Sequence, residues 1–136
     1  MKEFLWPVRV YYEDTDSGGV VYYANYLKYL ERARTELLRR YGFEQDQLIE
    51  KENIIFAVRS LNMEYIKPAR FNDLLQVSAE LVRVGPASLT FRQEIVRDND
   101  NCLLNWAEVK IACLQADKML PCAIPEIIRK EITYAD

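Results

Sequence analysis

The first residues of the chain alternate between apolar and polar side chains, which is the pattern of a β-strand with one buried face. Residues 6–12 form this stretch, and Val8, Val10 and Tyr12 share the face that we expect to be buried. The polar residues 13–19 come next and end in two glycines. This composition predicts a loop after the strand.

Residues 25–41 show the spacing of three and four residues that is typical of an amphipathic helix. Arg39 and Arg40 lie in its last turn, where positive charge is favourable. Gly42 is placed to end the helix, and we expect a short helix over residues 44–51. The apolar stripe of the long helix consists of Leu27, Leu30, Ala33 or Arg34, Leu37 and Tyr41.

The second half of the chain consists of β-rich stretches separated by short turns. A short helix is expected near the C-terminus, over residues 125–130. We expect strands over residues 54–66, 74–84, 88–97 and 102–114. One face of the second of these strands carries Leu75, Val77, Ala79, Leu81 and, less clearly, Arg83.

Together these elements predict an α+β fold. Strands joined by short turns form an antiparallel sheet, and the long helix has to bury its stripe against that sheet. The simplest arrangement is a curved antiparallel sheet wrapped around one central helix. The 136 residues are typical of one domain, which we expect to span residues 1–136. Because one helix covers only one face, we expect the other face or an edge to pair with a second copy.

The composition excludes several classes of function. The formal net charge of −3 gives no basic surface of the kind that binds nucleic acid. The N-terminal sequence is unlike a signal peptide and no segment is apolar enough to cross a bilayer, so we expect a cytoplasmic location. The chain has no histidine, which removes Ser-His-Asp and Cys-His mechanisms and His-ligated metal sites. A catalytic base near neutral pH must then be Asp, Glu, Lys, Tyr or Cys.

The three cysteines do not suggest a metal or redox motif. Cys102, Cys113 and Cys122 form no CxxC pair, and each lies in or beside an apolar stretch. We therefore expect buried free thiols.

Residues 8–43 resemble the signature region of the YbgC / 4-hydroxybenzoyl-CoA thioesterase family. The core pattern, Thr-Asp-x-x-Gly-x-Val-x-x-x-x-Tyr, runs from Thr15 to Tyr26. The resemblance continues through residues 63–65, 68–73, 87–91, 107–109 and 124–125, and so covers nearly the whole chain. It implies a hotdog fold, a homodimer or homotetramer, and hydrolysis of acyl-CoA thioesters. YbgC-like members are often associated with the Tol–Pal envelope system, on its cytoplasmic side.

The resemblance also implies a catalytic pair. The second Asp of the motif, here Asp16, is the catalytic carboxylate of the family, and the backbone amide at the position of Tyr23 polarises the thioester carbonyl. Many YbgC-like members carry histidine at that position, whereas the hydroxybenzoyl branch carries tyrosine. A backbone donor is unaffected by this difference, but the acyl group is left open between short-chain and aromatic. In the hydroxybenzoyl branch, basic residues near the turn Gly85-Pro86-Ala87 hold the CoA phosphates. This turn has none, so we expect the phosphate contacts to come from elsewhere.

Thioester hydrolysis of this kind needs no histidine, metal or cofactor. CoA takes part only as a portion of the substrate. A thioester is activated, so its hydrolysis needs a base or nucleophile and a hydrogen-bond donor for the developing oxyanion. A helix N-terminus offers such donors, and Gly18 and Gly19 allow the backbone to approach a ligand closely. The carboxylate can attack the carbonyl directly or deprotonate a water, and the sequence leaves both routes open.

The remaining candidates are substrate-binding residues. Gly19 and Asn25 flank the helix start, and Asn25 is either a helix cap or a pocket residue. Ser88 either lines the acyl pocket or lies on an ordinary strand, and Lys67 and Arg70 are candidates for contacts to the CoA phosphates. Asp14 is expected to be a structural carboxylate of the turn.

Two other functions are compatible with the same fold. One is a non-catalytic module that binds or assembles around acyl-CoA or acyl carrier protein. The other is a hotdog dehydratase, but such enzymes generally pair a histidine with a carboxylate, and the chain has no histidine.

Overall fold

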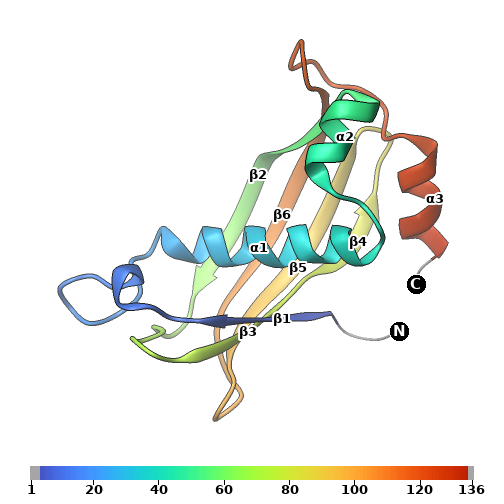
Figure 1. The fold of residues 1–136 in the computed structure, drawn as a ribbon. Helices are drawn as coiled ribbons and strands as arrows, with labels where there is room; N and C mark the ends of the chain where they lie inside the picture. Colours follow the sequence, from blue (N-terminus) through green and yellow to red (C-terminus); the bar gives the residue numbers. More distant parts are fainter. Residues whose placement is uncertain (1–3, 135–136) are drawn as a thin grey trace.

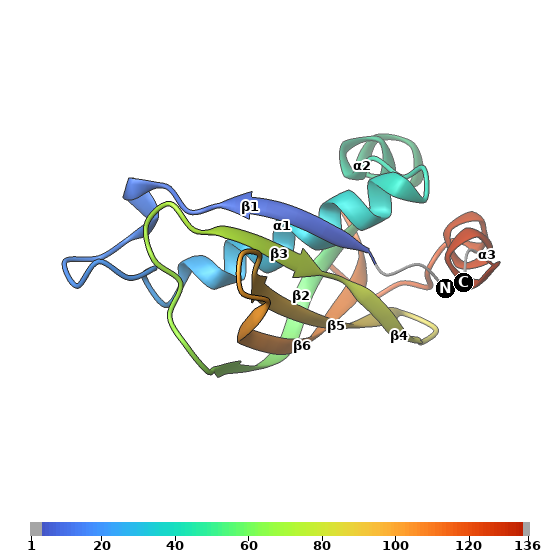
Figure 2. The ribbon, with the colours of Figure 1, turned by 90° about the horizontal axis from the view of Figure 1, so that it is seen from below.

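A sheet of six antiparallel strands curves around the long helix α1 (Asn25–Arg40) in the computed structural model, which describes residues 4–134 (Figures 1 and 2). The strand order is β1-β3-β5-β6-β2, and β4 also pairs with β5. The predicted arrangement of sheet and helix is confirmed. The strands are β1 (Leu5–Arg9), β2 (Ile54–Tyr65), β3 (Leu74–Ser78), β4 (Glu80–Val84), β5 (Ser88–Arg97) and β6 (Cys102–Gln115). Two shorter helices are α2 (Gln45–Glu52) and α3 (Glu126–Tyr134).

Helix α1 has the predicted bounds to within one residue and ends in the predicted way. Gly42 has a φ of 98° and donates its N–H to Arg39, while Phe43 donates to Leu38. These two bonds form the Schellman motif that glycine favours at a helix end. The stripe is shifted from the prediction, because Leu27 is 40% exposed and Tyr29 is buried. The helix therefore turns its tyrosines, and not Leu27, toward the sheet.

The first strand ends earlier than the sequence predicts. β1 stops at Arg9, and Tyr12 lies in a 3₁₀ turn (Tyr12–Asp14) with its side chain 80% exposed. The cause is a side-chain bond, since the Asp14 carboxylate accepts the N–H of Tyr11 at 2.8 Å and closes the chain into a turn.

The predicted strand over residues 74–84 is two strands, β3 and β4, interrupted at Ala79. A register shift between Leu81 and Arg83 then moves Arg83 to the opposite face from Leu75 and Val77. Arg83, which the sequence placed less clearly on the face of Leu75 and Val77, therefore does not share that face. Such an irregularity bends a strand.

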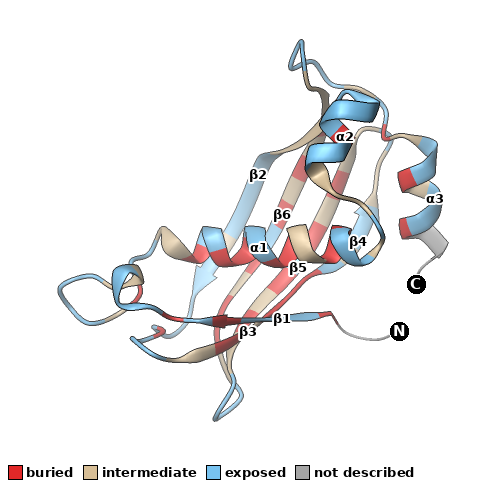
Figure 3. Ribbon diagram, in the orientation of Figure 1, coloured by how far each residue is buried: buried red, intermediate tan, exposed pale blue. Residues whose placement is uncertain are grey.

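The core lies between α1 and the concave face of the sheet. Along β5, Leu89, Phe91, Gln93 and Ile95 are at most 1% exposed and alternate with less buried residues (Figure 3). Burial is much weaker along β2, which forms one edge of the sheet. No helix among residues 4–134 is long and apolar enough to cross a membrane.

Candidate active site

The loop between β1 and α1 presents Asp16 on a tight turn. The N–H of Asp16 donates to Val20, and the N–H of Gly19 donates back to the Asp16 carbonyl at 3.0 Å. Gly19 has a φ of 80°, a conformation that glycine adopts without strain. The turn is therefore built by the two glycines that the sequence singled out.

The Asp16 side chain is oriented by this turn. Its Oδ1 accepts the N–H of Gly18 at 2.8 Å, whereas Oδ2 accepts no hydrogen bond from residues 4–134. Asp16 is exposed in the single chain. One carboxylate oxygen is thus anchored, and the other is free for a substrate or a water.

Asp14 fixes the loop to the start of helix α1. Its carboxylate accepts the N–H of Tyr11 and the side-chain amide of Asn25, and its carbonyl accepts the N–H of Tyr22 at 2.9 Å. Burial, and next the nearby Asp14 carboxylate, raise the pKa of Tyr29, which keeps that phenol neutral. Asp14 is structural, as expected, and Asn25 connects the loop to the helix.

Tyr23 lies just before the helix, whose N-cap residue is Ala24. The carbonyl of Tyr23 accepts the hydroxyl of Tyr65 at 2.9 Å. Within residues 4–134 its own N–H has no hydrogen-bond partner. This amide therefore has the free N–H that an oxyanion donor requires, although it lies two residues before the first residue of the helix.

The segment that carries Lys67 and Arg70 pairs with the Asp16 loop. Arg70 forms an antiparallel bridge with Val20, and Val21 donates to Ala69 at 2.9 Å. The hydroxyl of Tyr26, on α1, accepts the N–H of Ala69. Burial raises the pKa of Tyr26, and the carboxylates of Asp73 and Asp16 add to the rise. The structure thus brings Asp16, Gly19, Tyr23 and Asn25 together with the basic segment.

Ser88 does not join this group in the single chain. It begins β5 at the β4–β5 turn, where its carbonyl accepts the N–H of Gly85. That turn and the Asp16 loop lie at opposite ends of the molecule (Figure 1). In one chain, Ser88 occupies an ordinary strand position.

A cavity of 270 Å³ that no pattern in the sequence predicted lies between α1, α2 and β2. Its walls combine apolar and polar side chains, with Leu38, Phe56 and Val58 among the apolar ones, and Arg34 reaches it from α1. Arg34 is 7% exposed, and no carboxylate in residues 4–134 lies within salt-bridge distance of it. Burial lowers the pKa of Arg34, and Glu31, also in the wall, opposes that effect.

Gln93 holds the Arg34 guanidinium in place. Its side-chain oxygen accepts from Arg34 at 3.0 Å, and its amide donates to the carbonyls of Leu30 and Ser78. Two features of the sequence could have indicated this contact. Gln93 is at an inward position of the 88–97 strand, and Arg34 is at an apolar position of the helix.

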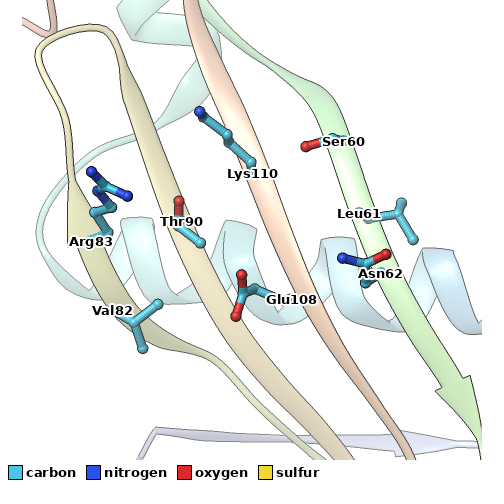
Figure 4. Close-up of a pocket in the computed structure, with 8 residues that line it drawn as sticks. All are labelled: Ser60, Leu61, Asn62, Val82, Arg83, Thr90, Glu108 and Lys110. Atoms are coloured by element: carbon cyan, nitrogen blue, oxygen red, sulfur yellow. The ribbon is translucent and has the colours of Figure 1, made fainter.

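A larger cavity, of 470 Å³, opens on the face of the sheet that points away from α1 (Figure 4). Arg83 and Lys110 lie at one end of it, with Thr90 between them, and Glu108 lies nearby. None of the residues proposed from the sequence lines it. No group of three His, Cys, Asp or Glu side chains able to hold a metal ion occurs in the described part of the chain.

Comparison with known proteins assigns the family. The model of the thioesterase superfamily matches residues 18–104. The chain belongs to this superfamily. It is 49% identical to the acyl-CoA thioester hydrolase YbgC of Escherichia coli over 128 residues, 94% of each chain. It is 45% identical to the YbgC acyl-CoA thioesterase of Haemophilus influenzae, over 93% of this chain and 91% of that one. The resemblance to YbgC-like proteins is confirmed.

Solved structures of thioesterases share the fold. A probable thioesterase from Bartonella henselae is 33% identical and superposes with a TM-score of 0.85, over 91% of this chain and 100% of that one. The DHNA-CoA thioesterase of Staphylococcus aureus is 22% identical, with a TM-score of 0.91 over 99% of this chain and 91% of that one. The predicted hotdog fold is confirmed, and the superfamily makes this chain a thioesterase.

Proposed function

We propose that this protein hydrolyses the thioester bond of a short-chain or aromatic acyl-CoA, with Asp16 as the catalytic carboxylate and no cofactor beyond the CoA of the substrate. The observation that carries the proposal is the Asp16 turn, because one carboxylate oxygen is anchored by Gly18 while Oδ2 accepts no hydrogen bond from the part of the chain that the structure describes. Similarity to curated YbgC acyl-CoA thioesterases supports the substrate class. The family resemblance further supports a cytoplasmic location and a link to the Tol–Pal system.

The two groups that the chemistry needs lie on the same loop. Oδ2 of Asp16 either attacks the thioester carbonyl, giving a mixed anhydride, or takes a proton from the attacking water. The unpartnered N–H of Tyr23 is available to the carbonyl oxygen as negative charge develops on it. A backbone donor of this kind is typically worth about 3–4 kcal/mol of the barrier.

The phosphates of CoA have a candidate partner beside this loop. Lys67 and Arg70 are exposed, and they lie on the segment that pairs with Val20 and Val21. Both guanidinium and ammonium groups bind phosphate oxygens. We therefore keep Lys67 and Arg70 in the proposed substrate-binding set, together with Gly19 and Asn25, whereas Ser88 can join it only from a second copy of the chain.

Turnover of a panel of CoA thioesters tests the proposed activity. Acetyl-, butyryl-, octanoyl-, palmitoyl- and 4-hydroxybenzoyl-CoA are incubated with the protein, and released thiol is measured. We expect at least one short-chain or aromatic thioester to be hydrolysed with a kcat/KM of about 10⁴ M⁻¹s⁻¹ or more. Saturable binding of every member without thiol release would favour a non-catalytic acyl-CoA-binding module instead.

The proposed site is completed by a second copy of the chain. Strand β2 is an edge strand with 12 residues, and its Val58, Leu61 and Tyr65 are 49%, 38% and 50% exposed. Exposed apolar edges of this length favour pairing with another strand. In a two-fold dimer identical edges pair antiparallel, so pairing about the strand centre sets Tyr65 opposite Ile54 of the second copy.

Such pairing would place the Arg34 cavity of one copy beside the Asp16 loop of the other. The cavity wall includes Phe56 and Val58, which lie in the N-terminal half of β2. Tyr65, at the other end of β2, holds the carbonyl of Tyr23. We propose that this cavity, whose apolar wall includes Phe56 and Val58, receives the acyl group while Asp16 of the second copy acts on the thioester.

A mixing experiment tests the shared site. Asp16→Asn removes the carboxylate, and Thr35→Trp fills the cavity, so each variant alone should be nearly inactive. When equal amounts of the two variants are co-refolded, half of the dimers are heterodimers. Each heterodimer has one intact site out of two, so we expect about a quarter of the original activity.

The matched control replaces the Thr35→Trp chain with the double variant Asp16→Asn/Thr35→Trp, which should restore nothing. Absence of recovery in the first mixture, despite heterodimers seen by native mass spectrometry, would show that each site lies within one chain. Thiol release from the panel of CoA thioesters would still show whether the protein is a thioesterase.

A further inference from the structure

The end of β6 brings two of the three cysteines together. Cys113 lies in β6, and the chain returns beside it so that Leu114 and Pro121 form an antiparallel bridge. The N–H of Cys122 donates to the carbonyl of Cys113 at 2.9 Å. The two sulfur atoms are 3.7 Å apart, and both thiols are free. The spacing of nine residues in the sequence gave no indication of this pair.

The two thiols differ in their access to solvent. Cys113 is buried, with a relative exposure of 0%, whereas Cys122 is half-buried. Burial, and next the neighbouring Cys122, raise the pKa of Cys113. Cys122 is therefore the sulfur that a dissolved reagent reaches, and Cys113 lies directly behind it.

We propose that Cys113 and Cys122 are a modification site at which a low-molecular-weight disulfide converts the two thiols into an intrachain disulfide. The thiolate of Cys122 attacks one sulfur of the reagent, whose S–S bond breaks and releases one thiol. Cys113 then loses its proton to solvent and attacks the Cys122 sulfur of the mixed disulfide, which releases the second thiol. Two protein thiols lose two electrons and two protons, and the reagent becomes two thiols.

The backbone around the pair favours this bond. Facing positions of an antiparallel pair place Cβ atoms about 4.5–5.5 Å apart, close to the separation of about 3.5–4.5 Å that a disulfide requires. The sulfurs have to approach from 3.7 Å to about 2.05 Å, which side-chain rotation can supply because Cys122 is only half-buried.

The bond would tie down the start of the C-terminal segment. This segment covers the β4–β5 turn, where Ile124 donates to Pro86 and Arg129 donates to Gly85 at 2.6 Å. Cys122 lies at its beginning, before Ile124 and α3. The disulfide would therefore connect β6 covalently to the segment that holds the β4–β5 turn.

Oxidation of the folded protein by glutathione disulfide tests the proposal. The protein is equilibrated with the reagent, then denatured and alkylated, and its intact mass and peptides are measured. Of the three cysteines in the chain, we expect only Cys102 to remain alkylatable, with a cross-linked peptide joining Cys113 to Cys122. The Cys102→Ser variant should fall from two alkylatable thiols to none, whereas Cys122→Ser should not form an intrachain disulfide.

Several outcomes would overturn the proposal. These are three alkylatable thiols after equilibration, a stable glutathione adduct on Cys122, or a bond that uses Cys102 or a second chain. The test does not depend on thioesterase activity, so a failure here and a failure of the proposed function can be told apart.

Discussion

The Asp16→Asn variant should lose about a thousandfold in kcat toward every acyl-CoA that the unmodified protein hydrolyses. Asparagine is uncharged, so it neither attacks a carbonyl nor accepts a proton from water, whereas the free Oδ2 of Asp16 can do both. A thousandfold loss corresponds to about 4 kcal/mol of barrier. Steady-state thiol release with the best substrate of the panel measures it.

The fold should survive this change. Asparagine keeps an oxygen that can accept the N–H of Gly18, and residue 16 is exposed in the single chain. The thermal midpoint should therefore stay within about 2 °C, since surface changes are usually worth less than about 0.5 kcal/mol. Asp46→Asn is a matched control, because Asp46 is exposed on α2 and its variant should retain full activity. Comparable activity of both variants would exclude Asp16 as the catalytic carboxylate.

The Gln93→Leu variant should lower the free energy of unfolding by about 3 kcal/mol. Gln93 has a relative exposure of 0% and makes three hydrogen bonds, to Arg34, Leu30 and Ser78. Leucine fills similar volume but leaves the buried guanidinium and two carbonyls without these partners. Urea denaturation should show a lower midpoint with an unchanged slope.

Two further variants isolate the cause. Gln76→Leu is the same substitution on β3, where the only side-chain partner within residues 4–134 is the exposed Asp98, so it should cost about 0.5 kcal/mol or less. Adding Arg34→Met to Gln93→Leu removes the charge that lacks a partner, and the double variant should be more stable than Gln93→Leu alone. If Gln93→Leu and Gln76→Leu cost the same, the buried network does not stabilise the helix–sheet contact.

Elements with a clear period or clear turns at their ends were predictable from the sequence. The β-rich stretch of residues 88–97 between two turns gave β5 with its exact bounds, and the spacing of apolar residues with Gly42 gave α1 to within one residue. The Asp16 loop was found through its motif. Its glycines and polar residues then form the turn for which those residue types are suited.

Features that depend on tertiary contacts were not predictable. The interruption at Ala79 and the register shift near Val82 are set by pairing with β5, which no local pattern reports. Ser88 was grouped with Asp16 although the fold sets them at opposite ends of one chain. The Cys113–Cys122 contact arises only because the chain turns back after β6.

The turn that holds Asp16 has a thermodynamic consequence for substrate binding. A free aspartate side chain samples several staggered rotamers, and immobilising a mobile side chain on binding costs about 0.5–1.5 kcal/mol. In this protein the Gly18 N–H already restricts that rotation before any ligand arrives. The entropy loss is therefore incurred when the chain folds, and the affinity for substrate is not reduced by it.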